Sequence, residues 1–328
     1  MNTILPVAGG KGGIGKTIFS ANLGVALAQL GKTTVLIDLD LGSSNLHTCL
    51  GIKNRHPGIG SYIYKKADSL QSLIVETDVP SLFFIPGDSL FPGTANLPFF
   101  TKQKILKEID SIPADFVILD LGAGSAYNTI DFYLSSSSGI IMSTPETTSI
   151  LSAYSFLKNT VYRLLFRSFK AKSTERDIIK HFVSEPIEES SGSFNDLIPL
   201  LQEHSEESAE HARSQLASFY PRVVLNIGSS NKDFAIGGKL REIASKNIGI
   251  GMEYIGFLPA EANISRSILE RTPYILLNPN SPFSSAIATV ARKISASTHH
   301  RSPRLYTDDE DIRELQKEFI DGSNHGGS

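Results

Sequence analysis

The amino-acid sequence predicts an α/β fold in which a doubly wound, mostly parallel sheet lies between two layers of helices. Two observations support this prediction. Short, continuously apolar runs alternate with amphipathic stretches along the 328 residues, and such runs are typical of parallel strands that are buried on both faces. Hydrophobic residues make up 41 % of the chain, which is enough for a sizeable core. We therefore expect a three-layer α/β/α architecture.

The apolar runs give the predicted strands in chain order, because each is short and bounded by turn residues. They are residues 4–8, 33–38, 81–86, 116–121, 139–144, 222–227 and 252–258. Pro6 lies inside the first run, although a proline is usually tolerated only in an edge strand or at a bulge.

The stretches between these runs have helical periodicity, and several begin after Ser, Thr, Asp or Pro, which favours a helix start. The predicted helices are residues 17–30, 98–111, 147–165, 233–246, 264–271 and 282–297. The alternation of the two kinds of element is typical of a parallel sheet with helical crossovers.

We predict one domain over residues 1–297, interrupted by an acidic insertion at about 166–221. Within it, residues 185–210 hold eight acidic residues and no Lys or Arg, with Ser and Gly interspersed. This composition favours a solvated loop or a helical lid over a docking surface.

A polar tail is predicted over residues 298–328. Its acidic run, 308–311, precedes Ile312, Leu315 and Phe319, whose spacing places them on one face of a helix. Gly and Ser are frequent in the last residues. We expect one short helix in an otherwise loose tail.

Charge disfavours some kinds of partner, and cysteine content excludes some kinds of site. The net charge of -3 gives the whole molecule no attraction to nucleic acid or anionic lipid. Cys49 is the single cysteine, which excludes an internal disulfide and a cysteine-paired metal site within one chain. Because the sequence begins at its first strand and holds no run of about 18 apolar residues, we expect a cytoplasmic location.

A glycine-rich segment between the first strand and the first helix predicts a phosphate-binding loop. It fits the pattern G-x-x-x-x-G-K-[ST] at every fixed position, with the residues Gly10, Lys11, Gly12, Gly13, Ile14, Gly15, Lys16 and Thr17. Backbone N–H groups and the helix N-terminus would hold the phosphates. We expect Lys16 to reach the β- and γ-phosphates and the Thr17 hydroxyl to bind Mg²⁺.

A second carboxylate for the metal is predicted at the end of a neighbouring strand. Four apolar residues, 116–119, lead directly to Asp120, and we assign Asp120 to the Mg²⁺ shell in preference to helix capping. Gly122 and Gly124 follow, and their turn is suited to contact a γ-phosphate and to relax when it leaves.

Asp38 and Asp40 follow another strand. Side chains at i and i+2 point to the same side of an extended chain, so both carboxylates are expected to face the metal and the γ-phosphate. We assign Asp40 to positioning the attacking water and Asp38 to the outer metal shell. Alone, these residues would also suit a simple acidic turn.

These motifs together resemble the MinD/ParA family of deviant Walker ATPases. The resemblance rests on residues 11–17, on the run Val35-Leu36-Ile37-Asp38-Leu39-Asp40-Leu41-Gly42-Ser43-Ser44-Asn45-Leu46, and on Ile118-Leu119-Asp120. It continues through 256–259 and 267–273 and covers most of residues 1–297. Within the family, the sequence is most similar to the MinD and FlhG (flagellar placement) branch.

The resemblance implies roles for individual residues. Lys11 matches the signature lysine that crosses a nucleotide-sandwich dimer to touch the partner's phosphates, so Lys11, Lys16 and Asp40 would be the catalytic residues. Asn226 and Pro259 match positions that hold adenine, and ATP is expected because no Lys-x-Asp follows Asn226.

The sequence also departs from the family pattern. At Ile18 many relatives have a polar residue near the α-phosphate, so that contact would come from the backbone. The tail helix is acidic, so we do not expect direct membrane insertion through it.

The implied function is a slow, dimerising ATPase switch, with ATP and Mg²⁺ as cofactors and a second copy of the chain as partner. A further protein partner, from flagellar or division machinery, would recognise the closed dimer and could place the protein at the membrane or cell pole. An alternative is a ParA-like partitioning ATPase that binds DNA through a basic region, for which the candidates are Lys232, Lys239, Arg241 and Lys246.

Two further alternatives are weighed. A metal-handling or metabolic relative would need paired cysteines or a substrate pocket, and the sequence has signatures of neither. An interaction protein could instead dock a basic partner through residues 185–210, with ATP hydrolysis as its timer.

Overall fold

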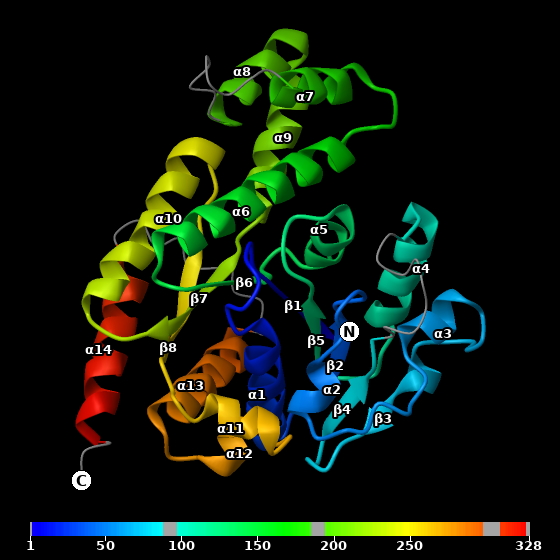
Figure 1. Cartoon of the computed structure of the whole chain (residues 1–328). Coiled ribbons are helices and arrows are strands. Elements are labelled where there is room, and N and C mark those ends of the chain that lie inside the picture. The colour runs from blue at the N-terminus through cyan, green and yellow to red at the C-terminus, as the bar shows by residue number, and fades with distance from the viewer. Residues whose placement is uncertain (1, 88–96, 185–193, 298–308, 326–328) are drawn as a thin grey trace.

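Eight strands form one sheet in the order β3-β4-β2-β5-β1-β6-β7-β8, and the helices cover both of its faces (Figure 1). The computed structural model describes residues 2–87, 97–184, 194–297 and 309–325. All neighbouring strands are parallel except β3, which runs antiparallel to β4. The predicted doubly wound three-layer architecture is confirmed.

The strands lie close to their predicted positions. They are β1 (Thr3–Ala8), β2 (Thr34–Leu39), β3 (Val75–Glu76), β4 (Leu82–Ile85), β5 (Phe116–Leu121), β6 (Ile140–Ser143), β7 (Arg222–Gly228) and β8 (Glu253–Pro259). The sequence did not predict β3, because two residues are too short for a periodic pattern.

The helices between the strands include short ones that sequence periodicity did not reveal. The described helices are α1 (Lys16–Gln29), α2 (Leu46–Cys49), α3 (Ile59–Ile63), the 3-10 turn η1 (Gln71–Leu73), α4 (Phe99–Asp110), α5 (Tyr127–Tyr133), α6 (Thr147–Ser168), α7 (Thr174–Ser184), α8 (Phe194–His204), α9 (Glu206–Ser218), α10 (Lys232–Ile248), α11 (Ile264–Leu269), α12 (Tyr274–Leu277), α13 (Pro282–Ser297) and α14 (Glu310–His325).

The two faces of the sheet carry separate hydrophobic cores, because successive strand residues point to opposite sides. On one face, α1, α12 and α13 pack against Leu36, Ile118 and their neighbours. On the other, α4, α5, α6 and α10 pack against Val35, Ile37 and Leu119. The fully buried strands explain why their sequences are continuously apolar.

Pro6 occupies a central strand, not the edge or bulge that a proline usually needs. β1 lies between β5 and β6, and Pro6 is in register with Leu119 of β5. The ladder between β1 and β6 begins only at Val7, and the proline ring lies beside Gly139, where a Cβ atom would come within 3.0 Å of its Cγ. β1 therefore accommodates a proline, which has no N–H group, at a position where it is not yet paired with β6.

The acidic insertion is mostly helical where the structure describes it, in α7, α8 and α9. α8 buries Leu197 and Leu201, and α9 buries Ala209 and Ala212 in the same core as α6. A solvated loop is therefore wrong for the described residues, since the apolar residues between the acidic ones form one face of each helix. Residues 185–193 lie outside the described part.

The tail helix is docked and not loose. α14 buries Ile312 and Leu315, and the Phe319 ring lies 5.0 Å from that of Phe257 on β8. Asp311 accepts a hydrogen bond of 2.7 Å from the backbone N of Tyr254, so α14 covers part of the edge strand (Figure 1). The polar composition predicted a loose tail because the contacts that dock α14 are far away in the sequence; Asp308 lies outside the described residues.

Candidate nucleotide-binding site

The loop between β1 and α1 has the geometry that phosphate binding requires. α1 begins at Lys16, and Gly15 before it has a φ of 88°, a left-handed conformation that favours glycine. At Gly10 a Cβ atom would lie 2.0 Å from the backbone O of Ser152 in α6. The glycines are thus needed both for the turn and for the close approach of α6.

Lys16 and Thr17 lie next to the carboxylate of Asp120. Lys16 is buried, which lowers its pKa, whereas the negative charges of Asp120 and Asp40 act to raise it. The side chains of Thr17 and Ser20 both hydrogen-bond to Asp120, Ser20 at 3.0 Å from Oγ to Oδ1. The structure therefore brings the two predicted metal ligands together, and it adds Ser20 as a partner that the sequence analysis missed.

Asp38 and Asp120 are paired in register on β2 and β5, and both are buried. Burial, and then the nearby Asp38, raises the pKa of Asp120 to about 7. Burial raises the pKa of Asp38 to about 6, although hydrogen bonds from Ser44, Leu46 and Asp40 act to lower it. Two buried carboxylates and the Thr17 hydroxyl are hard oxygen donors, which suit Mg²⁺.

The carboxylate of Asp38 also holds the following loop. Its Oδ2 accepts hydrogen bonds from Ser44 Oγ at 2.6 Å and from the backbone N of Leu46 at 3.1 Å, and its Oδ1 accepts one from the backbone N of Asp40 at 3.1 Å. Asp38 thus shapes the segment that carries Asp40. The outer-shell role assigned to it stays a prediction.

Asp40 and the glycine turn after β5 meet in front of the phosphate-binding loop. A Cβ atom on Gly122 would lie 3.1 Å from Oδ1 of Asp40, so a larger residue there would push this carboxylate by a few tenths of an ångström. The backbone N of Gly124 donates to the carbonyl O of Gly9 at 3.3 Å. A change in either segment would therefore be felt by the loop that grips the phosphates.

Lys11 points away from its own loop. Its Nζ lies 3.3 Å from Oε2 of Glu146, the residue before α6, and its side chain is 47 % exposed. Lys16, in contrast, is buried beneath the loop. The two lysines of one motif therefore lie in different environments, and their separate roles stay predictions.

The residues expected near the base lie at the ends of the last two strands. Asn226 of β7 is buried, and its Nδ2 donates to the carbonyl O of Ile14 at 2.9 Å. Pro259 ends β8 and is half-buried. Ile18 is half-buried on α1 and packs against the core of that face. The contact of Asn226 with the loop was not predicted, and the adenine roles of Asn226 and Pro259 stay predictions.

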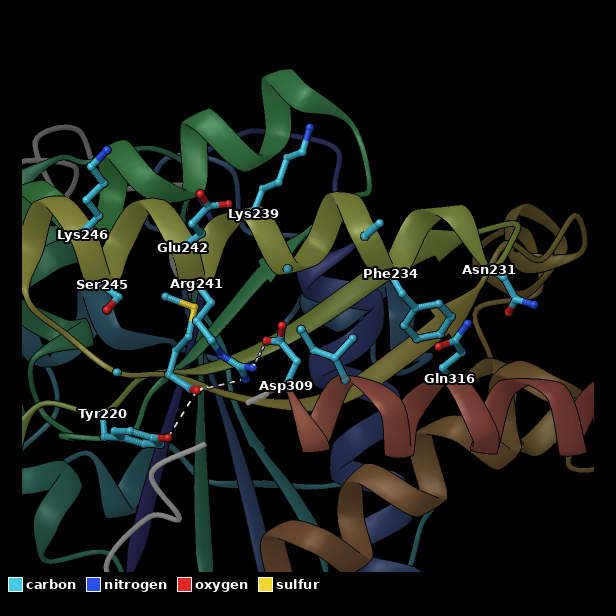
Figure 2. A pocket seen from close by; sticks show the side chains of 15 residues that line it. Tyr220, Asn231, Phe234, Lys239, Arg241, Glu242, Ser245, Lys246, Asp309 and Gln316 are labelled. Atoms are coloured by element: carbon cyan, nitrogen blue, oxygen red, sulfur yellow. Dashed lines mark hydrogen bonds and ion pairs between the residues drawn. The ribbon is translucent and has the colours of Figure 1, made fainter. Parts of the chain in front are cut away.

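The candidate DNA-binding cations on α10 do not all face solvent. Figure 2 shows Arg241 pointing to Asp309 at the start of the tail, whereas Lys239 and Lys246 extend away from it. Arg241 forms ion pairs with both Asp309 and Asp311, and its side chain is largely buried. Arg241 therefore anchors α14 and is not free to bind a phosphate backbone.

Among the described residues, no cluster of three or more His, Cys, Asp and Glu side chains could hold a metal by itself. A divalent cation at Thr17 and Asp120 would therefore need further oxygens, such as those of a nucleotide phosphate. None of the described helices is long and apolar enough to cross a membrane.

The glycine loop between β1 and α1, with the acidic ends of β2 and β5 beside it, defines a protein of the phosphate-binding-loop, nucleotide-binding class. Residues 5–274 match the model of the CobQ/CobB/MinD/ParA nucleotide binding domain, and the chain belongs to this family. The predicted resemblance is thereby confirmed.

Relatives and solved structures agree with this assignment. A putative septum site-determining protein MinD of Emiliania huxleyi is 34 % identical over 162 residues, which are 47 % of this chain and 56 % of that protein. The flagellum site-determining protein YlxH of Helicobacter pylori is 33 % identical over 159 residues, 47 % of this chain and 52 % of that protein. The chain thus spans about half the length of these relatives.

The fold recurs in the septum site-determining protein MinD of Pyrococcus horikoshii, solved with Mg-ADP. The TM-score is 0.62 at 19 % identity, with 93 % of this chain and 100 % of that one covered.

Proposed function

We propose that this protein is an ATP-hydrolysing switch that dimerises when it binds ATP and that regulates the placement or number of a cellular structure. The observation that carries the proposal is the exposed position of Lys11, paired with Glu146, in the same chain as the buried Lys16, Asp38 and Asp120. A lysine that leaves its own loop is available to a second nucleotide. The relatives named as site-determining proteins support the output of the switch.

The residues divide the chemistry among them. Lys16 and the loop N–H groups bind the β- and γ-phosphates, and Thr17 with Asp120 holds Mg²⁺, which would neutralise charge on the phosphates when bound. Asp40 orients the attacking water, and Asp38 holds the segment that carries Asp40. In-line placement and charge neutralisation are the main demands of phosphoryl transfer, so no covalent intermediate is needed.

Lys11 supplies the missing positive charge in trans. In a face-to-face dimer it would exchange Glu146 for the partner's phosphates, a role comparable to that of an arginine finger. Hydrolysis removes the γ-phosphate and with it the charge that holds Lys11, so the dimer opens. The nucleotide thus times the lifetime of the closed form.

Light scattering after size exclusion tests this proposal with Mg-ATP or Mg-ADP. We expect a dimer with ATP and a monomer with ADP. Asp40→Ala should accumulate the dimer, because it binds ATP without turning it over, and Lys11→Ala should bind ATP yet stay monomeric. Lys239→Ala, which removes an exposed lysine on α10, serves as the control and should behave as the unmodified chain. An Asp40→Ala protein that binds ATP but never dimerises would rule the proposal out.

The output of the switch is tested separately. Affinity capture on the Asp40→Ala dimer with ATP should enrich flagellar or division components. A ParA-like partitioning role would instead retain DNA in an ATP-dependent, salt-sensitive manner, and the internal pairing of Arg241 removes one of its four candidate cations.

A further inference from the structure

Three cations converge on one buried carboxylate in α5, the helix that follows the turn of Gly122 and Gly124. Asp131 of α5 is 2 % exposed. It accepts hydrogen bonds from Arg163 Nε at 2.8 Å and Nη2 at 3.0 Å, and from Arg167 Nη1 at 3.0 Å. Lys102 of α4 forms a further ion pair with it. Three positive charges against one negative charge leave this junction of α4, α5 and α6 cationic.

Asp131 remains ionised in this setting. Burial alone would raise its pKa, but the hydrogen bonds from Arg163 and Lys102 outweigh burial, and the pKa lies below its usual value. The carboxylate therefore fixes the directions of both guanidinium groups. Arg163 and Arg167 are 18 % and 28 % exposed, so each retains a side open to a ligand.

The segment that holds α5 and α6 supplies few anions to balance these charges, although Glu175 and Asp177 follow in α7, which packs against α6. Between residues 121 and 174 the acidic residues are Asp131 and Glu146, whereas five residues are basic. Glu146 precedes the first turn of α6, where it pairs with Lys11, and Arg163 and Arg167 lie near the other end of this 22-residue helix. The basic residues of this segment therefore lie mainly toward the C-terminal end of α6 and just after it.

Large aromatic side chains are exposed around the same cations. Phe100 at the start of α4 is 78 % exposed, and Tyr127 at the start of α5 is 60 % exposed. The Arg163 guanidinium lies 4.9 Å from the centre of the Tyr127 ring, and that of Arg167 lies 5.9 Å from the centre of the Phe99 ring. Exposed aromatic rings next to arginines are characteristic of protein interfaces.

This surface is connected to the nucleotide site through α5. The turn that holds Gly122 and Gly124 is followed directly by α5, and Gly124 bonds to the phosphate-binding loop. Figure 1 shows α5 between α4 and the C-terminal end of α6. A rearrangement of this turn would therefore shift Tyr127 and Asp131 relative to their neighbours.

We infer that the cationic face, formed by Arg163 and Arg167 with Phe99, Phe100 and Tyr127 and backed by the buried Lys102, docks an acidic, helical segment of a partner protein. Carboxylates suit the arginines, because guanidinium groups bind them in a bidentate, directional manner. Apolar residues of the segment would cover the aromatic rings. A nucleic acid is disfavoured, because only a few partly buried cations are present and a phosphate backbone is bound by many exposed ones.

A direct binding measurement tests this inference on the full nucleotide-free chain. The probe is a labelled synthetic peptide with Glu on one face of a helix and Leu and Phe on the other, followed by fluorescence anisotropy. The double variant Phe100→Ser with Arg167→Gln should weaken binding about tenfold, since both anchors are lost. The matched control, Leu269→Ser with Arg266→Gln, removes an 83 % exposed leucine and an exposed arginine from α11 and should leave binding within about twofold.

Amide hydrogen exchange locates the bound peptide, and we expect protection in α4, α5 and the end of α6. The inference is overturned if both double variants bind the peptide equally well. It is also overturned if the peptide does not bind, while duplex DNA or phosphatidylglycerol vesicles bind in a way that requires Phe100 and Arg167. This inference rests on the proposed function in one respect, because the peptide stands for the partner of the proposed switch. If the chain binds the peptide but does not dimerise with ATP, the proposed function alone is refuted. If it dimerises with ATP but does not bind the peptide, the docking face alone is refuted.

Discussion

At the scale of single residues, the site depends on charged side chains that are buried and closely packed. Asp38, Asp120 and Lys16 are buried beneath a glycine loop, and each has a pKa displaced by burial. Buried charges are tolerated when they are paired or bind a cation. The displaced pKa values therefore fit a site that binds a metal ion and phosphate groups.

Gly10 and Gly12 provide a test of how the loop is built. Gly10→Ala should lower the free energy of unfolding by about 2 kcal/mol, because the new methyl group would collide with the Ser152 carbonyl of α6. At Gly12 the nearest atom to a Cβ is 4.0 Å away, so Gly12→Ala should change stability by less than about 0.5 kcal/mol. Urea unfolding of the nucleotide-free proteins measures both, and equal losses would contradict this account of the loop.

Much of this site could be predicted from the sequence, because its parts lie at the ends of strands with clear patterns. The glycine loop, Asp38, Asp40 and Asp120 all follow continuous apolar runs. Ser20 and the contact of Asn226 with Ile14 could not be predicted, because a hydroxyl or an amide gains its role only from the partner that folding brings to it. For Ser20 a weak signal exists, since it lies one helical turn beyond Lys16 and Thr17.

At the scale of secondary-structure elements, α14 shows how a polar segment can become part of the fold. The spacing of Ile312, Leu315 and Phe319 predicted the helix, but not its docking. The docking depends on Arg241 and Tyr254, which lie more than fifty residues away in the sequence, with Tyr254 57 residues from Asp311. An ion pair between residues this far apart in the sequence produces no periodic pattern from which it could be predicted.

Asp309 and Asp311 both form ion pairs with Arg241, one exposed and one buried, so their variants compare the two kinds of pair. Asp311→Ala should destabilise the protein by about 3 kcal/mol, because Arg241 and the Tyr254 N–H would lose a buried partner. Asp309 is 55 % exposed, so Asp309→Ala should cost less than about 1 kcal/mol. Thermal and urea unfolding compare the two variants. If Asp309→Ala is as damaging as Asp311→Ala, the buried pair is not what anchors α14.

At the scale of the whole molecule, the proposed catalytic unit is two chains that each lend a lysine to the other. This arrangement makes a specific prediction for mixtures of inactive variants. Lys11→Ala and Asp40→Ala chains should each lack ATPase activity alone. A mixed dimer would hold one complete site, with Asp40 from one chain and Lys11 from the other.

A mixture should therefore regain ATPase activity that neither variant has alone, because each mixed dimer holds one working site. Phosphate release measured over a series of mixing ratios tests this gain. The control mixes Asp40→Ala with a Lys16→Ala chain, which cannot hold nucleotide firmly and should not restore the rate. No recovery in the test mixture would show that Lys11 acts within its own chain, and recovery in the control would show that the gain does not depend on a complete site.

Both edges of the sheet are protected against pairing with a strand of another chain. At one edge Asp311 of α14 occupies a backbone N–H of β8, and at the other β3 is only two residues long and antiparallel. Open edges invite a neighbouring chain to add a strand, which leads to fibres. With both edges protected in this way, strand addition between copies of this chain is disfavoured.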